Sequence, residues 1–169
     1  MDTNQISNIL SSDCNLATLF SGVYACDRLP VNCEQPAALV SNTDSHDKPG
    51  THWVVIFIRD GVGEYFDSFG MPPLNPYFID FLNRNCSRWN FNNDDFQSVG
   101  STVCGHYCIW FLSQRAGGRS LQEIQGDFCS SNVKNDKIIA QLVKQKFGNP
   151  VSYKTWECQS CLPRCKDAF

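Results

Sequence analysis

The sequence lacks long apolar segments, strong charge of one sign and internal repeats. No apolar run in its 169 residues approaches the roughly 18 residues that a membrane-spanning helix needs. The formal net charge of −3 predicts no general attraction to nucleic acid or to an anionic membrane, although a local basic groove stays open as an alternative. Histidine is also scarce, with three in the chain. What the chain does have is 42% hydrophobic and 12% aromatic residues, which is typical of one globular domain.

The opening segment, residues 1–14, lacks the basic and apolar stretches of a secretory signal. We therefore expect a reducing compartment, in which the ten cysteines need not form disulfides and some are small buried apolar side chains. The domain is expected to span residues 1–150, and a cysteine-rich tail is expected at 151–169.

Apolar periodicity and turn residues predict the order of helices and strands. Helices are predicted at 4–10, 34–41, 76–84, 104–116, 120–128 and 133–146. Strands are predicted at 52–59, 64–70 and 88–97, and loops at 20–30 and 41–50. The run at 52–59 is apolar on both faces, which is typical of a central strand. This order of elements predicts an α+β domain.

Cys104 lies where a polar loop meets a predicted apolar helix. A helix N-terminus lowers a thiol pKa, because its free N–H groups and its dipole stabilise the thiolate, which is the nucleophile. Gly105 follows, so no Cβ obstructs a substrate that approaches the sulfur. Any one of ten cysteines taken at random is more simply structural, and Cys108, one turn further along, is expected in the core. Position alone singles out Cys104.

The three histidines differ in how well they could serve as a base. His46 is expected in a solvent-exposed loop, and His106 points away from Cys104 because the two residues are only two apart on one helix. His52 begins the central strand, where a base can be held rigidly. A lone buried histidine is more simply a hydrogen-bonded core residue, so the case for His52 depends on its neighbours.

The next strand supplies an acidic partner for His52. With a two-residue turn at 60–61, Arg59 faces Val62, and Asp67 becomes a diagonal neighbour of His52 on one face of the sheet. An acidic group there fixes the imidazole tautomer and favours its charged form. The register is an assumption, because a slip by one residue puts the two side chains on opposite faces.

Gln97 ends the third predicted strand, seven residues before Cys104. Its side-chain amide can donate to an oxyanion that develops beside the nucleophile, together with the Cys104 backbone N–H. Taken alone, Gln97 is an ordinary polar residue at the end of a strand.

Four short segments follow one another along the chain: FSGVY at 20–24, THW at 51–53, FDSFG at 66–70 and QSVGSTVCGHYC at 97–108. Their order resembles that of the adenovirus protease family, which is related to the proteases of ubiquitin-like proteins. Each motif is weak by itself, and the ordered set carries the resemblance. It covers roughly residues 14–114.

The resemblance implies a role for each candidate residue. Cys104 becomes the nucleophile, His52 the base, Asp67 the third triad member and Gln97 the oxyanion donor. It also implies a single-domain, papain-like variant in which the central helix that carries the nucleophile packs on a mixed β-sheet. Asp67 stands where adenovirus enzymes usually have Glu, and the proteases of ubiquitin-like proteins use Asp. Val103 before the cysteine favours the viral branch.

The implied function is a viral-type thiol endopeptidase that cleaves capsid and core precursors after small residues, typically glycine. The chemistry itself needs no cofactor. The family implies an activating peptide from a capsid protein, joined by a disulfide, and Cys86 matches the partner cysteine in spacing. A free thiol at a helix end is an equal interpretation of Cys86. DNA is a second cofactor in the adenovirus enzymes, but the net charge of −3 gives it no support here.

Two rival functions stay open at this stage. The first is removal of ubiquitin-like modifiers, which uses the same triad. The second is a zinc-binding interaction module built on Cys158, Cys161 and Cys165, for which a mobile tail with oxidisable thiols is the simpler interpretation. The expected protein is a monomer in the host nucleus or cytoplasm and in the virion; it is not secreted, has no membrane contact and binds no metal.

Overall fold

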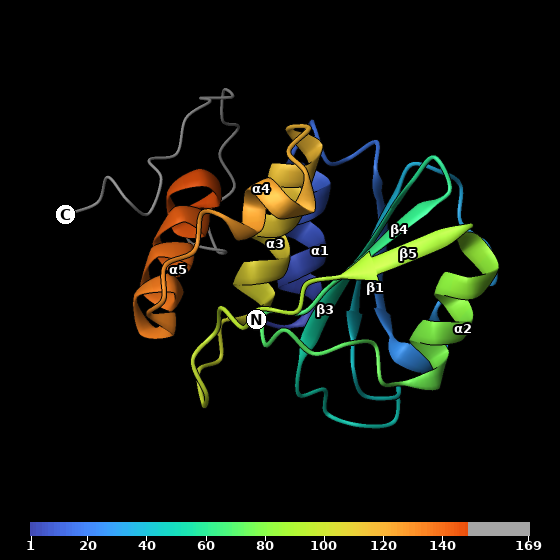
Figure 1. Cartoon of the computed structure of the whole chain (residues 1–169), viewed down its shortest axis with the longest axis horizontal. Helices are drawn as coiled ribbons and strands as arrows, with labels where there is room; N and C mark the ends of the chain where they lie inside the picture. The colour runs from blue at the N-terminus through green and yellow to red at the C-terminus, as the bar shows by residue number, and fades with distance from the viewer. Residues whose placement is uncertain (149–169) are drawn as a thin grey trace.

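The structure, a computed structural model, describes residues 1–148 as a five-stranded sheet with helices on both faces (Figure 1). The α-helices are α1 (Thr3–Ser12), α2 (Pro76–Asn85), α3 (Cys104–Ala116), α4 (Leu121–Gln125) and α5 (Asn132–Phe147), and η1 (Cys26–Arg28) is a short 3-10 helix. The strands are β1 (Phe20–Ala25), β2 (Ala37–Asn42), β3 (Trp53–Arg59), β4 (Val62–Phe66) and β5 (Arg88–Phe91).

The five strands lie side by side in the order of the sequence, so β3 is the central strand, as predicted. The outer pairs β1–β2 and β4–β5 are parallel, whereas β2–β3 and β3–β4 are antiparallel. The sheet is therefore mixed, and the predicted α+β fold with a central helix on a mixed sheet is confirmed.

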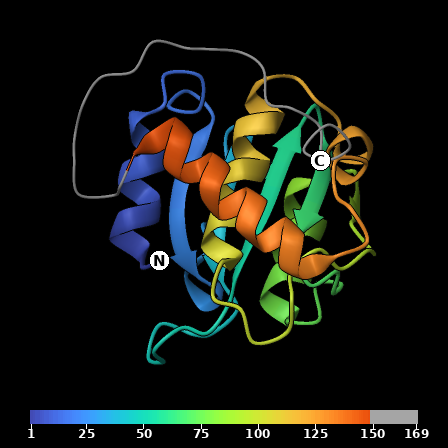
Figure 2. The same cartoon turned by 90° about the vertical axis from the view of Figure 1, so that its left-hand side faces the viewer.

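Strand β3 is buried on both faces because helices cover both sides of the sheet. Val55 and Phe57 contribute to one apolar cluster with α1, α3, α4 and α5, and Val54, Ile56 and Ile58 contribute to a second cluster with α2. Figures 1 and 2 show the same division, with α2 on one side and the other four α-helices on the opposite side. This two-sided burial fixes the start of β3, where His52 is attached.

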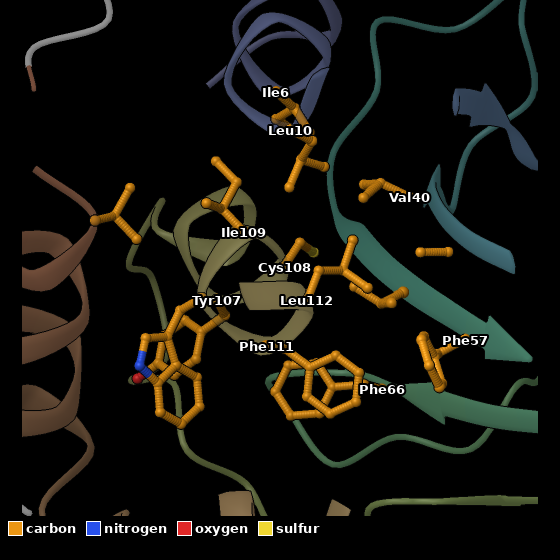
Figure 3. Packing of buried hydrophobic residues seen from close by; sticks show 14 of the residues in the cluster. Ile6, Leu10, Val40, Phe57, Phe66, Tyr107, Cys108, Ile109, Phe111 and Leu112 are labelled. Atoms are coloured by element: carbon orange, nitrogen blue, oxygen red, sulfur yellow. The ribbon is translucent and has the colours of Figure 1, made fainter. Parts of the chain in front are cut away.

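Helix α3 runs through the middle of the larger cluster (Figure 3). Its Phe111 stacks on Phe66 of β4 with ring centroids 4.3 Å apart, and Cys108 is 1% exposed, as expected for a core residue. The helix ends at Gly117, as predicted. Because one side of α3 packs on the sheet and another on α5, its first residue, Cys104, is held in a fixed position.

Two predicted elements in the first quarter of the chain are wrong. The expected loop at 20–30 contains β1 and η1, and the expected helix at 34–41 is β2. All six residues of β2 are buried, because β1 and β3 flank this strand on its two edges and helices cover its faces. Long-range strand pairing therefore overrides the local preference of Ala37, Ala38 and Leu39 for a helix.

Two predicted strands are shorter than expected. β4 ends at Phe66 and β5 at Phe91, so neither Asp67 nor Gln97 lies in a strand. Beyond the ends of both strands, the Asn92 side chain accepts from the Asp67 backbone N–H at 2.8 Å and donates to the Asp67 carbonyl at 2.6 Å. These bonds replace the backbone pairing that would have continued the two strands.

None of the helices within residues 1–148 is both long and apolar enough to cross a lipid bilayer. The predicted boundary at residue 150 and the tail at 151–169 lie outside the described residues.

Candidate active site

Three segments meet at one end of the central strands and line a pocket of about 370 Å³. The pocket lies beside the start of β3, the segment after β4 and the start of α3. Its walls are Met1, Gly50, Thr51, His52, Trp53, Phe69, Gln97, Gly100, Ser101, Thr102 and Cys104. Three of the four candidate site residues therefore line one cavity, and the fourth, Asp67, lies directly behind His52.

The predicted strand register explains how His52 meets Asp67. Arg59 pairs with Val62 across the two-residue turn, as predicted, and the antiparallel ladder brings the start of β3 beside the end of β4. The His52 Nε2 and the Asp67 Oδ1 lie 2.8 Å apart. The same carboxylate oxygen accepts from the Phe69 backbone N–H at 2.8 Å, so its orientation is fixed.

His52 and Cys104 line the same pocket, and their interaction shifts the pKa of both groups. Burial alone would lower the pKa of His52, but the hydrogen bond with Asp67 and the negative charges of Asp67 and Cys104 raise it to about 9. Burial likewise opposes ionisation of Cys104, yet its interaction with His52 and the nearby positive charge lower the pKa of the thiol. The arrangement favours a thiolate–imidazolium pair at neutral pH.

Backbone N–H groups add to the stabilisation of the thiolate. Those of Trp53 and Gly105 both interact with the Cys104 sulfur and lower its pKa. Val103 is the N-cap of α3 and makes no side-chain capping bond, so no side chain competes with the sulfur for the helix N-terminus. The start of α3 therefore helps to stabilise the Cys104 thiolate, as the sequence suggests.

Gln97 lies on the wall of the pocket at 1% exposure. Its Nε2 donates to the Ser101 carbonyl at 2.9 Å, and its Oε1 accepts from the Ser68 hydroxyl at 2.7 Å. The amide nitrogen has a second hydrogen, which is available to a group bound in the pocket. This donor and the N-terminus of α3 can together stabilise negative charge beside Cys104.

The other two histidines lie outside this arrangement. His46 has a half-exposed side chain and pairs with Asp27, with 2.6 Å between Nδ1 and Oδ2. His106 is half-buried, and burial lowers its pKa, which favours the neutral ring. Neither residue is among those that line the pocket.

Cys86 lies at the C-terminal end of α2, on the side of the sheet opposite α3 (Figure 1). Its side chain is partly buried in the smaller apolar cluster together with Cys33. Burial, and to a lesser extent Cys33, raises the pKa of the Cys86 thiol to about 11. The thiolate fraction at neutral pH is therefore small, so Cys86 reacts slowly with disulfides while it stays buried.

Three contributors to the site have no signal in apolar periodicity or in the spacing of residues. Asn92 holds the backbone of Asp67, Ser68 holds the amide of Gln97, and the Phe69 ring lies 4.8 Å from the His52 ring between centroids. Asn92 and Ser68 each contact a residue that is distant in sequence, and Phe69 lies in a turn. Neither situation produces a periodic pattern that could be recognised in the sequence. The motif FDSFG contains Ser68 and Phe69, and this is the only hint that they belong to the site.

Within residues 1–148, no group of three or more His, Cys, Asp or Glu side chains is placed to hold a metal ion. The three tail cysteines proposed as zinc ligands, Cys158, Cys161 and Cys165, lie outside the described residues.

No protein-family model and no curated protein matches this chain. Among solved structures, it is similar to a selenomethionine crystal structure of the ASFV pS273R protease, with 24% sequence identity and a TM-score of 0.47. The match covers 62% of this chain and 43% of that protease, so the chain spans less than half of its length.

Proposed function

We propose that this chain is a cysteine endopeptidase with Cys104 as nucleophile, His52 as base and acid, Asp67 as the orienting carboxylate and Gln97 as oxyanion donor. The observation that supports it best is the chain of contacts from Asp67 through His52 to Cys104 at the wall of a pocket. A buried histidine that only stabilised the core would need neither a polarised thiol nor an open cavity beside it.

The proposed mechanism is acyl transfer. The Cys104 thiolate attacks the carbonyl carbon of the scissile peptide, and the negative charge moves to the carbonyl oxygen, where the second Nε2 hydrogen of Gln97 and the Cys104 backbone N–H can donate to it. The His52 imidazolium gives its proton to the leaving amine, which releases the first product and leaves a thioester. Neutral His52 then removes a proton from water, the resulting hydroxide attacks the thioester, the carboxylic acid is released, and the thiolate–imidazolium pair of Cys104 and His52 is restored.

The substrate class is a proposal that rests on the family resemblance. Capsid or core precursors of a virus, cut after small residues such as glycine, are the expected substrates, and the site of action is the virion or the infected cell. Activation by a peptide bound at Cys86 belongs to the same proposal, whereas activation by DNA is implied by the resemblance alone and gets no support from the net charge of −3. Removal of ubiquitin-like modifiers is the alternative that the same geometry could support.

The direct test is covalent labelling with a peptide vinyl sulfone that ends in glycine, followed by peptide mapping. We expect one modified residue, Cys104, and loss of labelling in His52→Ala. Cys14 is an exposed free thiol and serves as an internal control for non-specific reaction. Labelling of Cys14 and Cys104 at equal rates, unaffected by His52→Ala, would contradict the proposed triad.

A second experiment separates the substrate classes. The purified chain is offered a peptide library with varied residues before the cut and, in parallel, a ubiquitin-like fusion protein. Cleavage of short peptides after glycine supports the endopeptidase, whereas cleavage of the folded fusion alone supports the alternative. Absence of cleavage in both arms, despite a correctly folded protein and with candidate activating peptides added, would refute peptidase activity.

A further inference from the structure

Both ends of the Gln97 side-chain amide are hydrogen-bonded within the protein. Its Oε1 is 2.7 Å from the Ser68 hydroxyl, and its Nε2 is 2.9 Å from the Ser101 carbonyl. Ser68 and Gln97 are each 1% exposed, so water does not compete with the contact between them. The two contacts hold the amide at both ends: the Ser101 carbonyl can only accept and so requires the NH₂, and the Ser68 hydroxyl, which can donate or accept, binds the oxygen at the other end.

The chemistry of the two partners determines which way the amide faces. The Ser101 carbonyl can only accept, so the group that faces it is the NH₂. The oxygen must then face Ser68, whose hydroxyl donates to it. Rotation of the amide by 180° would put two acceptors against each other at Ser101 and direct the Gln97 oxygen toward the negative charge that develops in the pocket.

The Gln97 backbone is fixed independently of this contact. Its N–H donates to the Ser68 carbonyl at 2.9 Å, and its own carbonyl accepts from the Asn132 side chain of α5 at 3.3 Å. The next residue, Ser98, donates to the Asp136 carboxylate through both its backbone N–H and its hydroxyl. Since the backbone cannot move freely, the remaining freedom is rotation of the side chain, and this is what the Ser68 hydroxyl restricts.

We propose that Ser68 is a positioning residue for the oxyanion hole, whose hydroxyl keeps the Gln97 amide nitrogen directed into the pocket beside Cys104. This inference rests on the proposed peptidase function for its kinetic consequence. Ser68 follows Asp67 directly, so one turn after β4 orients both halves of the site: the carboxylate behind the base and the donor for the oxyanion.

The first test compares two reactions of Cys104 in Ser68→Ala. Peptide hydrolysis passes through an oxyanion, whereas alkylation by iodoacetamide displaces iodide and forms none. Removing an oxyanion donor altogether lowers kcat by about 10²- to 10³-fold. A donor that is present but often turned away from the oxyanion should therefore lower kcat by less, about 10- to 100-fold. We expect that loss in kcat with little change in KM, while the rate and pH profile of Cys104 alkylation stay at wild-type values.

The matched control is Ser41→Ala, which also removes a fully buried serine hydroxyl. Ser41 lies on β2, and its hydroxyl donates to the Tyr24 carbonyl of β1 at 3.3 Å. It should lower thermal stability comparably and leave kcat unchanged. Equal losses of kcat in Ser41→Ala and Ser68→Ala would reduce the role of Ser68 to general stability and overturn the proposal. If Ser68→Ala does not fold, Ser68→Cys, which keeps the volume and replaces the hydroxyl by a weak donor, takes its place in the same comparison.

A double-mutant cycle tests whether Ser68 acts through Gln97. Gln97→Ala alone should lower kcat by about 10²–10³. Ser68→Ala added to Gln97→Ala should then have almost no further effect, because the amide that it positions is gone. Losses that multiply in the double variant would mean that Ser68 acts by a different route.

A measurement without substrate separates failure of this inference from failure of the proposed function. In protein labelled with ¹⁵N-glutamine, the side-chain NH₂ signal that vanishes in Gln97→Ala identifies this amide. We expect its hydrogen exchange to be slow in wild type and at least about tenfold faster in Ser68→Ala, since the loss of one buried hydrogen bond allows the amide to rotate. Unchanged exchange would overturn the positioning role, whether or not the protein cleaves peptides.

Discussion

Replacing Asp67 by Asn removes one negative charge from the site and keeps its shape. The Asp67 side chain is 5% exposed, and its Oδ1 accepts from both the His52 ring and the Phe69 backbone N–H at 2.8 Å. The Asn carbonyl oxygen can accept the same two hydrogen bonds. The substitution therefore tests the charge of Asp67 rather than the geometry of the triad.

The size of the effect follows from the pKa of His52, which rises from 6.5 to about 9. A difference of this size corresponds to about 3 kcal/mol of preferential stabilisation of the imidazolium. Asp67 and Cys104 share that stabilisation, so the loss of the Asp67 charge should cost about 1–2 kcal/mol, or roughly a 10-fold fall in kcat/KM. In a serine triad the same substitution costs about 10⁴ in kcat; the loss is smaller here because backbone N–H groups also stabilise the thiolate.

The assay is the pH dependence of Cys104 alkylation by iodoacetamide, beside peptide hydrolysis. The thiolate–imidazolium pair exists between the lowered pKa of the thiol and the raised pKa of His52. Loss of the Asp67 charge should move the upper limit downward from about 9, because the imidazolium loses part of its stabilisation, and should not raise the lower limit, because removal of a negative charge does not disfavour the thiolate; the window of rapid alkylation therefore becomes narrower from its alkaline side.

Asp27→Asn is the matched control, because Asp27 also pairs with a histidine ring, at 2.6 Å, but outside the pocket. It should leave the alkylation profile and the turnover at wild-type values. If Asp67→Asn alters turnover by less than about a factor of two and leaves the upper pH limit in place, Asp67 is not the third member of the triad and the reasoning from its charge is refuted.

Four further predictions follow from the same contacts. Cys104→Ala should abolish peptide cleavage and leave the thermal midpoint almost unchanged, because it removes a single sulfur atom from the edge of the core. The His52 ring, followed by NMR, should titrate near pH 9 and at a lower pH in Cys104→Ala; since protonation stabilises the fold, this contribution to the free energy of unfolding is complete below about pH 6.5 and is lost as the pH rises through about 9. Tyr107→Phe should lower the free energy of unfolding in urea by about 1–3 kcal/mol, because the hydroxyl contacts the Asp136 carboxylate at 3.0 Å and a backbone carbonyl at 2.8 Å. Stimulation by a cysteine-bearing capsid-derived peptide should largely vanish in Cys86→Ser and under strong reductant, because a disulfide makes the remaining contacts intramolecular.

Each prediction has an outcome that would contradict it. Residual cleavage in Cys104→Ala would point to another nucleophile, and a His52 pKa that does not change in that variant would mean that the thiolate contributes nothing to it. A Tyr107→Phe protein as stable as wild type would show that water or a rearranged Asp136 replaces the lost hydroxyl. Equal stimulation of wild type and Cys86→Ser would remove Cys86 from activation, and full activity without peptide would remove the activator.

The strand pair that carries His52 and Asp67 could be predicted because the sequence determines its register locally. Only a two-residue turn separates β3 from β4, and the apolar run of β3 fits a strand that is buried on both faces. Once the register is known, the approach of His52 to Asp67 follows from strand geometry. Helix α3 was predictable for a similar reason, since the apolar segment ends at Gly117 and begins where the polar loop stops.

The first two strands could not be predicted, because their identity depends on partners far along the chain. β2 has Ala37 and Ala38 at its start, which suit a helix, and becomes a strand only through pairing with β1 and β3. β1 contains Gly22 at a φ of 131° and a register shift beside it, so it lacks the regular alternation by which strands are recognised. In both segments tertiary contacts outweigh local preference.

The placement of Gln97 shows a further limit of pattern-based prediction. The sequence suggested a strand that ends at Gln97, but β5 stops at Phe91, and the loop that follows is held by side chains from α5 and by Ser68. Spacing of seven residues from Cys104 identifies Gln97 as a candidate, yet spacing says nothing about the direction of its amide. That direction depends on a hydroxyl next to Asp67 and on the Ser101 carbonyl, so the donor becomes useful only after the chain has brought three separate segments together. The residues that perform the proposed chemistry are thus visible in the sequence, whereas those that orient them become visible only in the fold.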